Sequence, residues 1–130
     1  MKVALYIPNS YLLASQKEKD EVSNGCGAKD GAKVPDYIWF LSILLACKIH
    51  DWMFEKGKTQ GDYWFANLIF FWNMTALVIN GSANKAMIIL RMGIVLVYFL
   101  GVMTRFGISA YWVKKEKNED NTITIKGSLV

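Results

Sequence analysis

The chain has 130 residues and a formal net charge of +4, and 53% of its residues are hydrophobic, including five Trp and seven Phe. This length supports one domain with a single core, here taken as residues 1–130. A compact chain of this size has too little interior for so many apolar side chains, so we expect an apolar surface that meets a partner or a lipid, or helices within a membrane. No nucleic-acid partner is expected.

The first part of the chain mixes short apolar stretches with a charged stretch. Residues 3–7 are strand-like, and Pro8 interrupts them without a cleavage site typical of a secretory signal. Residues 16–33 are charged and are predicted to form a loop with unusual backbone angles, because three glycines fall within seven residues, namely Gly25, Gly27 and Gly31.

Helical patterns dominate the rest of the chain, so the expected class is all-α, with three main helices and room for a minor β element: 37–56, 59–79 and 84–106. Pro35-Asp36 predicts the start of the first helix, and Gly57 its end. Thr59 followed by Asp62 is a variant of the capping box and predicts the start of the second helix, which Asn80-Gly81 ends.

The third helix is apolar between Ala86 and Met103 except for Arg91. A polar tail follows at residues 113–130, where residues 122–126 alternate like a short edge strand.

His50 and Asp51 lie on the first helix, opposite Asn67 on the second. Only a few residues join these helices, so we expect an antiparallel hairpin in which His50 and Asn67 lie at equal distance from the turn. An imidazole opposite an amide oxygen is a usable general-base arrangement. Asp51 lies about 100° further around the helix and can hold a hard cation.

The two cysteines of the chain are Cys26 and Cys47. A bond between them would bring the glycine loop over His50 and Asp51, where loop carbonyls could complete a calcium site and loop amides could face an oxyanion. Free thiols are the alternative, since a pair of cysteines does not fix the redox compartment.

Several blocks of sequence occur in a fixed order: NGCG at 24–27, VPD at 34–36, ACKIHDWMF at 46–54 and YFLGVMTRFGISAYW at 98–112. In this order they resemble the phospholipase A2 family, most of all its short bacterial and phage members. The resemblance covers about residues 24–112.

The resemblance implies His50 as the general base and Asn67 at the place of the family's supporting aspartate. It also implies that the amide of Gly27 faces the oxyanion. It implies Ca²⁺ as cofactor, held by the carboxylate of one residue and the carbonyls of three others: Asp51, Gly25, Gly27 and Lys29. Cys26 and Cys47 fall where secreted members link the calcium loop to the catalytic helix by a disulfide.

Two departures from the family pattern lie in one hydrogen-bond system. Asn67 replaces an aspartate, and an amide can turn to present its NH₂ and favour the wrong imidazole tautomer. Phe54 replaces a tyrosine and has no hydroxyl. We therefore expect weak catalysis.

The expected function is calcium-dependent hydrolysis of the sn-2 acyl ester of glycerophospholipids at a membrane surface, reached through exposed aromatics such as Trp39 or Trp64. One alternative is a catalytically silent relative that binds lipid or forms part of a phage virion with other virion or membrane proteins. A second is a holin-like small membrane protein, against which Arg91 counts. Whether the chain is an enzyme, and whether it is peripheral on a membrane, secreted or in a virion, stays open.

Overall fold

The computed structural model describes residues 2–23, 35–104 and 111–112. Over these residues the chain is mostly helical with one small antiparallel sheet, as the all-α expectation with a minor β element predicts. The elements follow in this order: α1 (Asn9–Leu13), α2 (Gln16–Val22), β1 (Tyr37–Ile38), β2 (Leu41–Ser42), α3 (Leu44–Lys56), α4 (Gln60–Gly81) and α5 (Lys85–Met103). The tail at 113–130, with its predicted strand at 122–126, lies outside the described residues.

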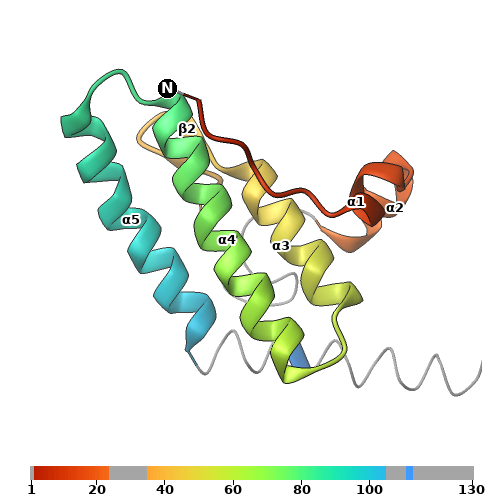
Figure 1. Ribbon diagram of the computed structural model, residues 1–130. Helices are drawn as coiled ribbons and strands as arrows, with labels where there is room; N and C mark the ends of the chain where they lie inside the picture. The colour runs from red at the N-terminus through yellow and green to blue at the C-terminus, as the bar shows by residue number, and fades with distance from the viewer. Residues whose placement is uncertain (1, 24–34, 105–110, 113–130) are drawn as a thin grey trace, which may run out of the picture.

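The three long helices lie side by side, with α4 between α3 and α5 and the short helices beyond α3 (Figure 1). The largest core cluster joins the β hairpin to these helices through buried apolar side chains: Ile38, Ile43, Ala46, Cys47, Phe70, Met74, Val78 and Val95. The central helix α4 therefore contributes to the interfaces with both of its neighbours.

Local signals set the ends of α4 as the sequence predicts. The Thr59 hydroxyl accepts a hydrogen bond from the Asp62 amide at 3.1 Å, and the Asp62 carboxylate accepts one from the Thr59 amide at 3.2 Å, which completes the capping box. The helix ends at Gly81. The helix before it, α3, ends with Gly57 as its C-cap, where an added Cβ would lie 2.9 Å from the Met53 carbonyl oxygen.

The prediction that the first long helix starts at residue 37 is wrong. Residues 37–42 form a hairpin, and α3 begins only at Leu44. Ile38 and Ile43 are both buried in the core, yet five residues on a helix are roughly 140° apart and would not face the same side. A hairpin brings both side chains inward, so tertiary packing overrides the helix-start signal of Pro35-Asp36.

The hairpin turn has an unusual composition. Trp39 and Phe40 occupy its two central positions with φ angles of 43° and 66°, in the left-handed region that two-residue turns require and that Gly and Asn prefer. The Phe40 side chain is fully exposed, at 101%. Packing of the ring against described residues thus does not explain this conformation.

Part of the predicted loop at 16–33 is helical. Residues 16–22 form α2, and the Ser15 hydroxyl accepts a hydrogen bond from the Glu18 amide at 3.1 Å. Because this N-cap lies before the glycines, the charged half of the stretch, residues 16–22, forms a helix.

The N-terminal segment, residues 2–7, pairs with α4 and not with a strand. The amide and carbonyl of Val3 bind the Asn80 side chain at 2.7 and 2.8 Å, and those of Tyr6 bind the Asn73 side chain at 2.8 and 2.9 Å. Each side-chain amide uses one donor and one acceptor in these contacts, as a residue of a neighbouring strand would. The backbone amides and carbonyls of Val3 and Tyr6, in the segment predicted as strand-like, thus have hydrogen-bond partners without a sheet.

α5 is the one helix in the described part of the chain that is long and apolar enough to cross a membrane. Only 11% of it is buried, so it is not the enclosed core helix of a globular fold. Its N-cap is Asn84, whose side chain accepts a hydrogen bond from the Met87 amide at 3.0 Å.

Arg91 of α5 points inward and is 7% exposed. Its terminal nitrogens donate to the Trp39 carbonyl at 2.7 Å, the Ser82 hydroxyl at 2.8 Å and the Gly81 carbonyl at 3.2 Å. Its Nε has no hydrogen-bond partner among the described residues. Arg91 therefore ties α5 to the hairpin turn and to the end of α4.

Candidate active site

His50 of α3 and Asn67 of α4 meet in the interior between the two helices. The imidazole Nε2 lies 2.8 Å from Asn67 Oδ1, and the two residues are 6% and 0% exposed. A connection of three residues, 57–59, separates the helices. The pairing of these two side chains, expected from their equal distance to the turn, is present.

The amide of Asn67 is oriented by α5. Its Nδ2 donates to the Val102 carbonyl at 3.4 Å and lies 3.3 Å from Met103 Sδ. A carbonyl only accepts, so Oδ1 must face the imidazole, whose Nε2 then carries the proton. The basic nitrogen is therefore Nδ1. The structure thus favours the useful tautomer, although the sequence suggested that the amide could turn.

Tyr63 also binds the Val102 carbonyl. Its hydroxyl donates to the Val102 carbonyl at 2.6 Å, and burial raises the Tyr63 pKa above its ordinary 10.0, while a hydrogen bond to Asn67 acts in the opposite direction. The hydroxyl stays protonated as a donor. Tyr63, Asn67 and Val102 form one network behind the imidazole.

Two aromatic rings pack against the imidazole. The ring centroids of Phe54 and Phe70 lie 4.1 and 4.4 Å from that of His50. The Phe54 ring also packs edge-on against Tyr111 at 5.2 Å. The aromatic side chain at 54 thus contributes packing and no hydrogen bond to the network.

Asp51 lies beside His50 on α3, and Ser23 binds it. The Ser23 hydroxyl donates to Oδ2 of Asp51, and Ser23 is 5% exposed directly after α2. The chain therefore enters the glycine stretch at the Asp51 carboxylate. The predicted ligands and oxyanion donor of that stretch lie outside the described residues: Gly25, Gly27 and Lys29.

A carboxylate at this point fits calcium, which takes hard oxygen ligands. Across residues 2–23, 35–104 and 111–112, no three side chains of His, Cys, Asp or Glu gather as a metal-binding group. Of the residues predicted to hold calcium, only Asp51 lies among the described residues.

Cys47 is buried on α3, one turn before His50, and is disulfide-bonded. The only other cysteine in the sequence, Cys26, lies outside the described residues.

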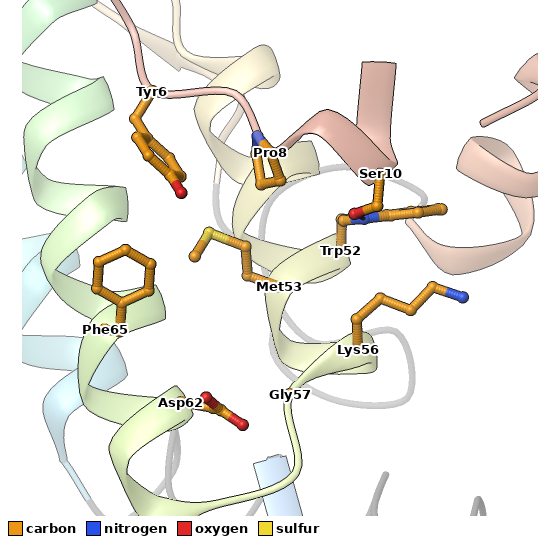
Figure 2. A pocket seen from close by; sticks show the side chains of 9 residues that line it. All are labelled: Tyr6, Pro8, Ser10, Trp52, Met53, Lys56, Gly57, Asp62 and Phe65. Carbon is orange, nitrogen blue, oxygen red and sulfur yellow. Dashed lines mark hydrogen bonds between the residues drawn. The ribbon is translucent and has the colours of Figure 1, made fainter. Parts of the chain in front are cut away.

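A cavity of about 240 Å³ lies near the site but does not include His50 (Figure 2). Its walls come from the N-terminal part of the chain, α3 and α4: Tyr6, Pro8, Ser10, Trp52, Met53, Lys56, Gly57, Asp62 and Phe65. It is smaller than the 300–1,000 Å³ typical of ligand pockets. The chemistry of His50 does not belong to this cavity.

Sequence reasoning missed Ser23, Tyr63 and Val102. Tyr63 precedes Asn67 by one helical turn and could have been found from that spacing. The sequence around Ser23 and Val102 has no comparable signal. The aromatics predicted at a lipid surface, Trp39 and Trp64, are 46% and 44% exposed.

No protein-family model, no curated protein and no solved structure matches the chain.

Proposed function

We propose that the chain is a phospholipase A2-like esterase that slowly hydrolyses the sn-2 acyl ester of glycerophospholipids at a membrane surface, with calcium as cofactor. The observation that supports this is the buried pair of His50 and Asn67 with Asp51 beside it on α3. The ordered sequence blocks add the family resemblance.

In the proposed reaction, Nδ1 of His50 takes a proton from water as the water oxygen bonds to the ester carbonyl carbon. The carbonyl π electrons move to its oxygen, where the Gly27 amide is the proposed donor. When that electron pair returns, the bond to the glycerol oxygen breaks, and the leaving oxygen takes the proton from the imidazolium. The products are a fatty acid and a lysophospholipid.

Asn67 explains why the proposed reaction is slow. It accepts the Nε2 proton and so fixes the tautomer, but it brings no charge to stabilise the imidazolium. In serine proteases the change from Asp to Asn costs about 10⁴ in rate, and we expect about 10²–10⁴ here.

Asp51, with the carbonyls of Gly25, Gly27 and Lys29, would hold the calcium ion. When bound, calcium would supply positive charge beside the ester carbonyl oxygen. Ser23 holds Oδ2 of Asp51 from the side of α2 and so orients the carboxylate.

The test is release of fatty acid from mixed phosphatidylcholine–detergent micelles with calcium. His50→Gln should reduce the rate to the level without protein, and Asp51→Asn should remove the dependence on calcium. Lys56→Gln, an exposed charge on the same helix, is the matched control and should leave the rate unchanged. Wild-type activity equal to that of His50→Gln would sink the proposal.

A catalytically silent lipid-binding relative is the second candidate. It is favoured by the 6% exposure of His50, whose ring packs against those of Phe54 and Phe70. Calorimetry separates the two candidates: calcium uptake lost in Asp51→Asn, without fatty acid release, would support the silent relative.

A further inference from the structure

The outer face of α5 is apolar from its second turn to its last. Five large aliphatic side chains point away from the protein with exposures between 48% and 71%, and we call them the outer stripe: Ile89, Leu90, Leu96, Val97 and Leu100. Gly93 lies between them and Gly101 directly after them, and both glycines are also exposed. The spacings of three and four residues place the whole stripe on one side of the helix.

The single charge of α5 after Lys85 points to the opposite side. Arg91 is buried and donates to three protein oxygens, those of Trp39, Gly81 and Ser82. In the sequence this arginine counted against a membrane helix. Intramembrane charges are tolerated where they face protein and bind backbone carbonyls, and Arg91 meets that condition.

The length of the stripe and its ends fit hydrocarbon. Nineteen residues of helix span about 28 Å at 1.5 Å each, close to the roughly 30 Å of a bilayer core. Asn84 and Lys85 precede the apolar stretch, and Thr104 and Arg105 follow it in the sequence. Polar residues thus bound the stretch at both ends.

After Lys85, every exposed residue of α5 is apolar or glycine, so the polar rim typical of a protein–protein interface is missing along this helix. The neighbouring helix continues the pattern, since no charged residue occurs between Asp62 and Lys85. Trp64, Leu68 and Trp72 of α4 are also exposed. Together these features favour lipid over a second copy of the chain.

We propose that α5 is embedded in the hydrocarbon of a lipid bilayer, with its outer stripe against acyl chains. The attachment is integral, in contrast to adsorption through a few aromatics. It does not depend on any chemistry at His50.

The test is flotation of the full-length protein with phosphatidylcholine vesicles, followed by high-salt and alkaline carbonate washes. The wild type should float and resist both washes. Leu90→Lys combined with Val97→Lys should raise the released fraction at least tenfold, because each lysine places a charge in hydrocarbon. Both side chains lie outside the protein, so circular dichroism in detergent should show an intact helical fold.

The matched control is Leu12→Lys combined with Leu13→Lys. These side chains on α1 are 58% and 87% exposed, and α1 lies on the far side of α3 and α4 from α5 (Figure 1). This pair should float like the wild type, as should His50→Gln, which separates failure of this proposal from failure of the esterase.

Release of the wild type by carbonate, with no effect of the stripe lysines, would overturn the proposal in favour of adsorption. A lipid-free dimer in sedimentation, dissociated by the stripe lysines and unable to float, would overturn it in favour of a second copy.

Discussion

Asn67 binds on both sides: its oxygen faces His50, and its nitrogen faces the Val102 carbonyl. Turning the amide would place a donor against the Nε2–H and an acceptor against a carbonyl. Asn67 therefore has the geometry that the proposed general base His50 requires of its partner, without the negative charge of an aspartate.

Changing Asn67→Asp supplies that charge and removes the donor to Val102. We expect fatty acid release to rise at least tenfold. The free energy of unfolding should fall by about 1–3 kcal/mol, because a buried carboxylate oxygen then replaces the donor near the Val102 carbonyl, which keeps the Tyr63 hydroxyl as its other donor. The measurements are the micelle assay and chemical denaturation. Asn67→Leu is the control and should lose both the tautomer and the activity. A folded aspartate variant with no gain would show that the imidazole is not a base.

Phe40 has a left-handed backbone angle and a side chain that is fully exposed. Phe40→Gly should raise the free energy of unfolding by about 1 kcal/mol, because glycine adopts this angle without the Cβ clash. Thermal and chemical unfolding measure the change. Phe40→Ala keeps the Cβ and should give no gain; an equal gain from alanine would mean that the ring, not the backbone, is the cause.

Among the elements, those with local signals were predictable. The capping box at Thr59 and Asp62 and the stop at Gly81 predicted α4 to within two residues. The hairpin at 37–42 has no such signal, because aromatics stand where Asn and Gly would mark the turn. Its conformation depends on contacts from distant parts of the chain, which a local pattern does not contain.

Some contacts of the candidate site could likewise be predicted from the sequence, and others could not. His50 and Asn67 could be paired from the sequence because a short connection fixes their heights on two helices. Ser23 could not, since its contact with Asp51 depends on how α2 packs against α3.

Arg91 links α5 to the hairpin turn and to the end of α4, so its substitution should destabilise more of the fold than α5 alone. Arg91→Met keeps the length and apolar stem but leaves the Trp39 and Gly81 carbonyls without their donor. We expect the free energy of unfolding in detergent to fall by about 2 kcal/mol. Lys85→Met, which removes an exposed charge from the same helix, is the control and should change little. Equal effects of the two would assign the loss to net charge.

At the scale of the whole molecule, buried tyrosines predict a response to alkaline pH. Burial raises the pKa of Tyr11, Tyr63 and Tyr111 above 10.0, with smaller contributions from Asp20 for Tyr11 and Asp62 for Tyr111. The unfolded chain releases these protons first. Their contribution to stability is therefore complete below pH 10 and is lost as the pH rises from 10 through the raised values.

Unfolding measured between about pH 8 and pH 11, with phenolate absorbance followed in parallel, tests this. The three tyrosines should ionise together with unfolding. Ionisation at their ordinary pKa in a chain that stays folded would contradict the prediction.

The pairing of residues 2–7 with α4 depends on a match between two lengths, one along an extended segment and one along a helix. Val3 and Tyr6 are three residues apart in an extended segment, about 10 Å, and Asn80 and Asn73 are seven residues apart on a helix, about 10.5 Å. Three extended residues thus measure the same length as seven helical ones. Deleting Ala4 or Leu5 shortens one side by about 3.4 Å and not the other, so only one asparagine can keep its partner. The segment therefore tolerates a change of side chain at Ala4 far better than a change of length.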